Sequence, residues 1–203
     1  STLLGGSPVL RERLDFSDGR SLKFEIHPRA FFQPNTLQAE VLYGEVLEAS
    51  GLATAPVGRV LDLYCGTGTI GLCLAHRADQ VVGIELVAEA VENARRNAAL
   101  NGIENVVFHQ GDVAEVLESE GLVKAGDIDL VVVDPPRNGL TPAALEFVAK
   151  LDVPRLVYVS CNPKSLARDV SVLCRHGHRL RRVRPVDMFP QTWHVETVAV
   201  LER

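Results

Sequence analysis

Five short apolar runs recur through the chain and restrict its fold more than any other feature. They are separated by stretches with helical periodicity and comprise residues 60–63, 81–84, 106–108, 130–133 and 156–159. Strands buried on both faces of a parallel sheet read as nearly continuous apolar runs, whereas half-exposed strands alternate. The pattern therefore predicts an α/β fold with a mostly parallel twisted sheet and helices on both faces.

The stretch after the second run is the clearest predicted helix. Small apolar residues from Val87 to Ala98 share one helical face, Glu92 can pair with Arg96 one turn later, and Asn101 and Gly102 end the helix. A further helix is expected over residues 164–174, followed by strands near 179–186 and 195–201. Because a short segment connects these strands, we expect an antiparallel pair at the end of the sheet.

The segment before the first apolar run has a different pattern. Residues 14–26 alternate around Ser17-Asp18-Gly19 and predict a hairpin. Asn35 or Thr36 can cap a helix that ends at Ser50 and Gly51. We therefore expect residues 1–50 to form an extension packed on a core domain of residues 51–203.

Length, composition and charge exclude several classes of protein. The 203 residues fit one domain, and no apolar stretch is long enough to span a bilayer. The N-terminus lacks a signal peptide, so a cytoplasmic location is expected, and the missing initiator Met suggests part of a longer protein. A net charge of −5 argues against a surface that binds nucleic acid everywhere. Seven Arg and His residues within 175–184 form either a local phosphate-binding patch or a charged edge strand.

Four cysteines are scattered along the chain without metal-ligand spacing, so no metal site is expected. Cys65, Cys73 and Cys174 are interpreted as buried packing residues. Cys161 differs, because Ser160-Cys161-Asn162-Pro163 directly follows an apolar run and so places a thiol in a βα turn. A thiol at the carboxyl end of a strand is positioned to react with a ligand.

The turn after the first run contains the glycine pattern of Gly66, Gly68 and Gly71, which allows a ligand close to the backbone. Glu85 ends the second run, where a carboxylate can accept hydrogen bonds from both hydroxyls of a ribose. These features fit either a nicotinamide dinucleotide or S-adenosylmethionine. The stiff Asp134-Pro135-Pro136-Arg137 loop after the fourth run suits a site for a planar base and has no evident use in a dehydrogenase.

At this point the chain resembles the RNA uracil-5 methyltransferases, which form 5-methyluridine in transfer and ribosomal RNA. The resemblance runs from about Phe31 to the C-terminus. Its motifs occur in the order of the family, namely Phe32-Gln33-Pro34-Asn35, Asp62-Leu63-Tyr64-Cys65-Gly66-Thr67-Gly68, Asp134-Pro135-Pro136-Arg137, Ser160-Cys161-Asn162-Pro163 with Arg168-Asp169, and His194-Val195-Glu196-Thr197.

The resemblance implies a Rossmann-like class I methyltransferase with Cys161 as nucleophile and Glu196 as base. It implies RNA, from tRNA or rRNA, as the partner, with Asp134, Arg137 and Asn162 near the substrate. Thr69 stands where the family often has Asn. The residues expected around S-adenosylmethionine are Gln33, Tyr64, Gly66, Gly68, Thr69, Glu85 and Asp134.

The expected chemistry accounts for these residue types. Carbon 5 of uracil is a poor nucleophile, so a thiolate must first add to carbon 6 and later leave. A base must then remove the proton from carbon 5. Glu196 lies 35 positions after Cys161, so it can serve only if the last strand returns beside the fifth run.

Several alternatives stay open from the sequence. The same addition would serve an enzyme that makes 5-methylcytosine, a nicotinamide oxidoreductase would use the glycine turn, and a non-catalytic module would bind the cofactor or RNA without needing Cys161. His194 and Trp193 either shape the base pocket or pack on their own loop. Many relatives carry an N-terminal RNA-binding barrel that this sequence does not show, so an RNA-binding domain is expected to be missing.

Overall fold

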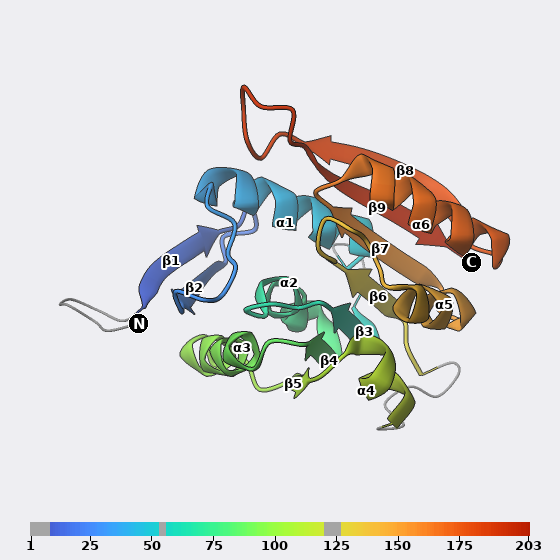
Figure 1. Ribbon diagram of the computed structural model, residues 1–203. Helices are drawn as coiled ribbons and strands as arrows, with labels where there is room; N and C mark the ends of the chain where they lie inside the picture. Colours follow the sequence, from blue (N-terminus) through green and yellow to red (C-terminus); the bar gives the residue numbers. More distant parts are fainter. Residues whose placement is uncertain (1–8, 53–55, 120–126) are drawn as a thin grey trace.

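A twisted seven-stranded sheet forms the centre of the protein (Figure 1). The computed structural model describes residues 9–52, 56–119 and 127–203. The strand order is β5-β4-β3-β6-β7-β9-β8. The strands are β3 (Val57–Leu63), β4 (Ala78–Glu85), β5 (Val106–Gln110), β6 (Leu130–Val133), β7 (Arg155–Ser160), β8 (Arg179–Val186) and β9 (Glu196–Glu202).

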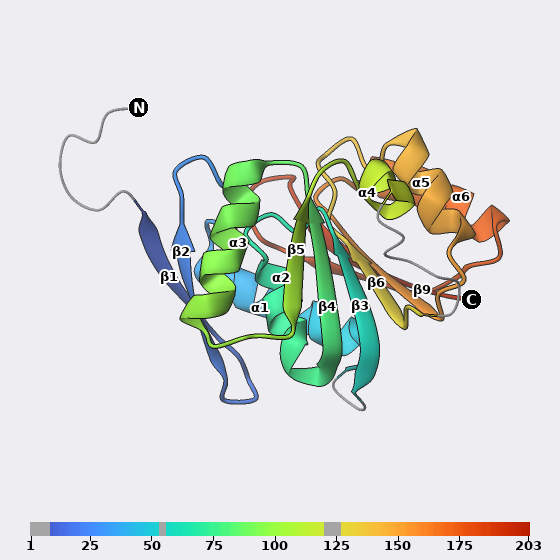
Figure 2. The same cartoon turned by 90° about the horizontal axis from the view of Figure 1, so that it is seen from below.

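Three helices cover each face of this sheet, as expected for apolar strands buried on both sides (Figure 2). One face packs against α1 (Thr36–Ser50), α2 (Thr69–Leu74) and α3 (Ala88–Leu100), and a 3₁₀ turn (Ala75–Arg77) follows α2. The other face packs against α4 (Val113–Ser119), α5 (Pro142–Lys150) and α6 (Pro163–Arg175). Successive strand residues alternate between two apolar clusters, so Val157 joins the first and Tyr158 the second. The predicted α/β fold is confirmed.

Strand β9 runs against the direction of the rest of the sheet. It pairs antiparallel with β7 on one side and with β8 on the other. The predicted antiparallel pair at the end of the sheet is therefore confirmed. Because β9 enters between β7 and β8, residues near the start of β9 lie beside the end of β7.

The N-terminal hairpin also has the predicted form. Strands β1 (Leu10–Asp15) and β2 (Ser21–Ile26) pair antiparallel, and Leu14, Phe24 and Ile26 are buried in the cluster that contains α1. Asn35 caps α1 by accepting a hydrogen bond from the backbone of Gln38 at 3.3 Å. Contacts therefore join residues 10–50 to the core, while the division into two units at residue 50 stays a prediction.

Two asparagines on α3 and a third that caps its C-terminus hold the hairpin against the core, an arrangement that the sequence pattern did not predict. Asn93, Asn97 and the C-cap Asn101 are spaced four residues apart, and their side-chain oxygens accept from the backbone N–H groups of β2 and the residue after it at 2.7–2.8 Å. Asn97 also donates to the carbonyl of Thr67 at 3.2 Å. The amide side chains thus satisfy one edge of β2 in place of a neighbouring strand.

Replacement of the buried Asn97 by Ala is expected to lower the free energy of unfolding by about 2–4 kcal/mol, because it leaves the N–H of Glu25 and the carbonyl of Thr67 without a partner. Urea unfolding followed by circular dichroism measures this change. The control is Asn101→Ala at the more exposed end of α3, where water can replace the lost bonds and a smaller effect is expected. An equal decrease in the free energy of unfolding in the two variants would contradict the expectation that burial makes Asn97 more important.

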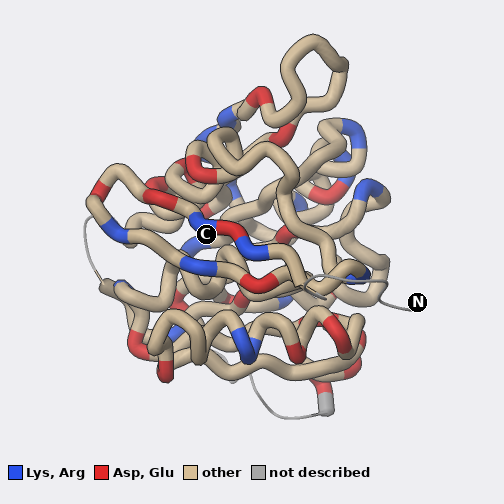
Figure 3. Tube along the Cα trace, turned by 90° about the vertical axis from the view of Figure 1, so that its left-hand side faces the viewer, with Lys and Arg blue, Asp and Glu red and all other residues tan. Residues whose placement is uncertain are grey.

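The basic segment around β8 lies at the edge of the sheet and is largely paired within the protein. Arg182 bonds to Glu45 and Glu48 of α1, each at 2.6 Å, and Arg181 bonds to Glu202 at 3.0 Å. Basic and acidic positions lie side by side near the C-terminus (Figure 3). The pairing favours the charged edge strand over the phosphate-binding patch, because these guanidinium groups already have carboxylate partners.

Candidate functional site

A cavity of about 580 Å³ lies at the carboxyl ends of the central strands. The chain order reverses at β3, which lies between β4 and β6, and ligands of open α/β sheets bind at such a point. Nine predicted site residues line this cavity, namely Gln33, Tyr64, Gly66, Thr69, Glu85, Asp134, Arg137, Cys161 and Glu196. The structure therefore brings together residues that are up to 163 positions apart in the sequence.

Two predicted site residues do not line the cavity. Gly68 adopts a φ of +79° behind the turn, where an added Cβ would lie 2.7 Å from the ring of Phe108. A side chain at this position would clash with Phe108 and Ala94, so glycine lets the turn pack closely against them. Asn162 caps α6 by accepting from Lys164 at 3.1 Å, and it donates to the carbonyl of Arg137 at 2.9 Å. It supports the loop that holds Arg137.

A buried carboxyl side chain on β3 bonds to the helix that follows the turn after this strand. Asp62 is fully buried and accepts a hydrogen bond from the backbone of Gly71 at 2.8 Å. Tyr64, two residues later, adopts a φ of +63°, an unfavourable conformation for a bulky residue. Burial raises the pKa of Asp62 from its ordinary value of 3.8 to about 8, and the nearby Asp134 and Glu85 also raise it.

The raised pKa of Asp62 makes the stability of the fold dependent on pH. The unfolded carboxyl ionises above about pH 4, whereas the folded one keeps its proton up to about pH 8. Folding therefore takes up a proton, and this contribution to stability is lost as the pH rises through that range, by at most about 1.4 kcal/mol per pH unit. Asp62→Asn is expected to flatten the dependence, measured by urea unfolding at several pH values. Asp152→Asn, whose side chain is 75% exposed, is the control and should leave the slope unchanged.

Glu85 and Gln33 give this cavity the polar groups that a nucleoside requires. The Glu85 carboxylate accepts from the backbone of Gly66 at 3.0 Å and from that of Val87 at 2.9 Å, which fixes its orientation. Each oxygen keeps lone pairs for hydroxyl donors. Gln33 is buried, and its side-chain oxygen has no hydrogen-bond partner among the described residues. A buried acceptor of this kind fits a site built for a ligand.

Cys161 and Glu196 lie side by side at the other end of the cavity. Strand β7 pairs antiparallel with β9 so that Ser160 lies opposite Thr197. Cys161 follows Ser160 and Glu196 precedes Thr197, so the antiparallel register brings these two positions together. Glu196 is 4% exposed and Cys161 is partly buried. The expected return of the last strand beside the fifth run is therefore confirmed.

Three acidic groups share this end of the cavity with one arginine. Burial raises the pKa of Cys161, Glu196 and Asp134, that of Asp134 to about 7, and Glu196 raises the pKa of the other two further. Arg137 lowers the pKa of Cys161 and Glu196. The Asp134 carboxyl can therefore hold or release a proton near neutral pH, as acid–base chemistry requires.

The sequence analysis did not predict some residues that line the cavity, and it predicted the wrong burial for two others. Phe31, Tyr43 and Asp112 also line the cavity, and the position of Asp112 just after a strand could have indicated this. Val87 was predicted on the buried face of α3, but it precedes the helix and is 43% exposed. Cys174 was predicted to be buried but is exposed, because it lies on the outer face of α6 although its neighbour Leu173 is fully buried, whereas Cys65 and Cys73 are buried as predicted.

The loop before β9 carries aromatic residues outside the cavity lining. Trp193 is 89% exposed and its ring lies 5.6 Å from that of His194. The Nδ1 atom of His194 lies 3.3 Å from Nη2 of Arg137. Within the described ranges, no helix is long and apolar enough to cross a membrane, and no cluster of three or more His, Cys, Asp or Glu side chains could hold a metal ion.

The sheet order, the helices on both faces and the cavity at the strand ends define a class I methyltransferase fold. Structures of the same architecture include the precorrin-6y C5,15-methyltransferase of Geobacter metallireducens, with a TM-score of 0.68 at 13% identity over 89% of this chain and 94% of that one. The model of the tRNA (uracil-5-)-methyltransferase family matches residues 6–203. The chain belongs to this family.

Individual relatives agree with that assignment. The chain is 46% identical to an uncharacterized RNA methyltransferase of Protochlamydia amoebophila over 98% of its own length, and 50% identical to one of Clostridium tetani over 90%. The crystal structure of the Pyrococcus abyssi tRNA (uracil-54, C5)-methyltransferase with S-adenosyl-L-homocysteine has a TM-score of 0.81 and 38% identity, covering 97% of this chain and 45% of that one. The chain spans 46% and 39% of the two curated relatives.

Proposed function

We propose that this chain transfers a methyl group from S-adenosylmethionine to carbon 5 of a uridine in tRNA or rRNA through a covalent adduct between Cys161 and carbon 6. The observation that supports it most is the pairing of β7 with β9, which sets Cys161 beside the buried carboxyl of Glu196 in the cavity that also holds Glu85. A thiol and a carboxyl at one end of a nucleoside-sized cavity are what addition and proton removal need.

The residues present fit S-adenosylmethionine. Glu85 is oriented to accept from the ribose hydroxyls, the unpaired oxygen of Gln33 can accept from a donor of the ligand, and Gly66 lets the ligand approach the backbone. Tyr64, Thr69 and Asp134 complete the expected set. The Pyrococcus abyssi structure contains the demethylated product of this cofactor, which supports the same choice here. When bound, the cofactor supplies an electrophilic methyl group on a positively charged sulfur.

The side chains then carry out the remaining steps. Cys161 loses its proton to solvent, and the thiolate forms a bond to carbon 6, which moves the electrons of the carbon 5–carbon 6 double bond toward carbon 5 and the neighbouring carbonyl. After carbon 5 has taken the methyl group, Glu196 accepts the proton from carbon 5. The electrons of that bond restore the double bond and expel the thiolate. Asp134 and Arg137 lie where they can contact the uracil edge.

The RNA must present an unstacked uridine, because both faces of the base have to be reached in this cavity. The paired arginines of β8 offer few free positive charges, so further RNA contacts are expected from a segment outside this chain, such as an N-terminal RNA-binding domain. A cytoplasmic location is part of the proposal. The family match favours uracil over cytosine as the target base.

The test incubates the chain with RNA and S-adenosylmethionine carrying a labelled methyl group, followed by digestion to nucleosides and mass spectrometry. Label in 5-methyluridine is the expected result. Label in 5-methylcytidine would replace uracil by cytosine as the substrate. Calorimetry with S-adenosylmethionine and with NAD checks the cofactor, and a chain that binds S-adenosylmethionine but labels no RNA, short or long, would overturn the activity for this chain.

A further inference from the structure

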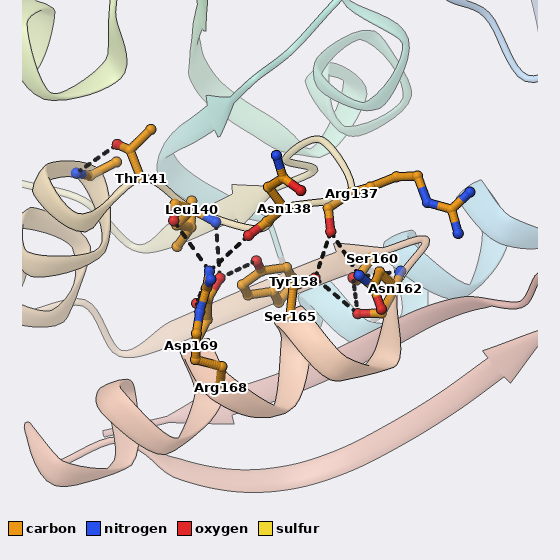
Figure 4. Close-up of polar contacts among 11 residues, drawn as sticks. Arg137, Asn138, Leu140, Thr141, Tyr158, Ser160, Asn162, Ser165, Arg168 and Asp169 are labelled. Atoms are coloured by element: carbon orange, nitrogen blue, oxygen red, sulfur yellow. Dashed lines mark hydrogen bonds and ion pairs between the residues drawn. The ribbon is translucent and has the colours of Figure 1, made fainter.

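A fully buried carboxylate on α6 contacts two other parts of the fold, the loop after β6 and strand β7, and its own neighbour Arg168 on the helix. Asp169 accepts from the backbone of Leu140 at 2.9 Å, from the hydroxyl of Tyr158 at 2.7 Å and from the guanidinium of Arg168 at 2.7 Å (Figure 4). Its side chain is 0% exposed. Burial of a charge is costly unless it is paired and bonded, so a carboxylate in this place indicates a definite role.

The carboxylate and its neighbours hold the loop between β6 and α5. Arg168 donates to the carbonyl of Asn138 at 2.9 Å and, more weakly, to that of Leu140 at 3.4 Å. Gly139 adopts a φ of +78°, and a Cβ added there would overlap the carboxylate of Asp169. The loop thus packs against the Asp169 carboxylate, and both backbone N–H and backbone C=O groups of the loop form hydrogen bonds with side chains of α6.

The first turn of α6 holds the same loop one residue earlier. The hydroxyl of Ser165 and the side-chain amide of Asn162 both donate to the carbonyl of Arg137, at 3.0 and 2.9 Å. Figure 4 shows these contacts on one side of the loop and those of Asp169 on the other. The backbone from Arg137 to Leu140 is therefore bound at both ends, while the Arg137 side chain is exposed.

This loop matters because of the charges that it carries into the cavity. Among the described residues that line the cavity, Arg137 is the one Lys or Arg, whereas Glu85, Asp112, Asp134 and Glu196 are acidic. The charged groups that face Cys161 are Glu196 from β9 and Asp134 and Arg137 from the loop. A displaced loop would leave the thiol among carboxylates with no nearby cation.

We propose that Asp169 is a positioning residue that fixes the loop of residues 134–141 and thereby holds Arg137 beside Cys161 and Glu196. The importance of this role rests on the proposed function, since the thiol must ionise to add to the base. Asp169 acts through the loop backbone and touches neither substrate nor cofactor. Tyr158, whose buried ring cannot move away, fixes the carboxylate from the sheet side.

The test measures the rate of alkylation of Cys161 by iodoacetamide as a function of pH, with the site mapped by mass spectrometry. A Cys174→Ser background removes the exposed competing thiol. Asp169→Ala and Arg137→Ala are each expected to lower the rate at neutral pH roughly three- to tenfold, which corresponds to a rise of about 0.5–1 in the pKa of the thiol. The double variant should be no slower than Arg137→Ala alone, because loss of Asp169 is expected to act only through the position of the Arg137 guanidinium.

Controls separate positioning from stability. Asp169→Asn keeps an oxygen for Leu140 and Tyr158 and should restore much of the wild-type profile. Leu173→Ala, buried on the same helix but away from the loop, should lower the melting temperature without changing the profile. If Asp169→Ala does not fold, Tyr158→Phe and Ser165→Ala provide the same measurement with smaller changes.

Two results would overturn the proposal. One is a wild-type alkylation profile in folded variants that lack the Asp169 contacts, and the other is a further loss in the double variant beyond that of Arg137→Ala. The measurement requires neither RNA nor cofactor. The alkylation result can therefore be interpreted even if the chain transfers no methyl group to RNA. Normal methyl transfer by Asp169→Ala, together with an unchanged alkylation profile, would show that Asp169 has a structural role only.

Discussion

Replacement of Cys161 by Ala is expected to lower methyl transfer by a factor on the order of 10⁴ or more, because no other described group at that end of the cavity can add to carbon 6. RNA that contains 5-fluorouridine gives the sharpest measurement. Fluorine at carbon 5 cannot be removed as a proton, so the enzyme should stall as a covalent protein–RNA adduct. Wild-type chain is expected to give a slow band on a denaturing gel, and Cys161→Ala none.

The controls for this result lie within the chain. Cys174→Ser removes an exposed thiol on α6 and should form the adduct as the wild type does. Cys161→Ser tests the chemistry, because a hydroxyl of similar size is a much poorer nucleophile at neutral pH. Adduct formation by Cys161→Ala, with the attachment mapped to another residue, would remove Cys161 from the mechanism.

Replacement of Glu196 by Gln is expected to separate addition from release. The variant keeps a side chain of the same size in its buried place, so Cys161 should still add to the base and carbon 5 should still take the methyl group. Loss of the base should slow proton removal by roughly 10²- to 10⁴-fold. The methylated adduct should then accumulate on ordinary RNA with uridine, which is visible on a denaturing gel and by mass spectrometry of the linked peptide.

The neighbouring carboxyl provides the comparison for Glu196. Asp134→Asn alters a group with a pKa of about 7 in the same cavity, and it is expected to slow formation of the adduct as well as its release. Turnover by Glu196→Gln equal to that of the wild type would show that another group takes the proton.

Much of the core could be predicted from local pattern. Runs such as 130–133 indicate strands buried on both faces, and the bounds predicted for β8 agree with the structure. Most site motifs follow a predicted strand, and parallel strands end at one edge of the sheet. This was sufficient to predict that nine of the candidate residues lie at one cavity. These predictions succeeded because they depend on burial and on residues close in the sequence.

Contacts with distant partners could not be predicted in the same way. Arg182 looks like a free cation in the sequence, but its carboxylate partners lie 134 and 137 positions away on α1. Likewise, the asparagines of α3 read as ordinary polar positions until β2 is placed beside them. The helical pattern of α6 predicted burial of Cys174, which instead lies on the exposed face of that helix.

From residue type and spacing alone, the sequence predicted the parallel sheet and the glycine turn, and it placed the candidate thiol of Cys161 in a βα turn. The tertiary structure decided that β9 enters between β7 and β8, that Glu196 is buried beside Cys161, and that Asp169 lies under the loop of Arg137. The physical reason is that the charge and proton affinity of these groups depend on burial and on neighbours that only the complete fold brings within a few ångströms.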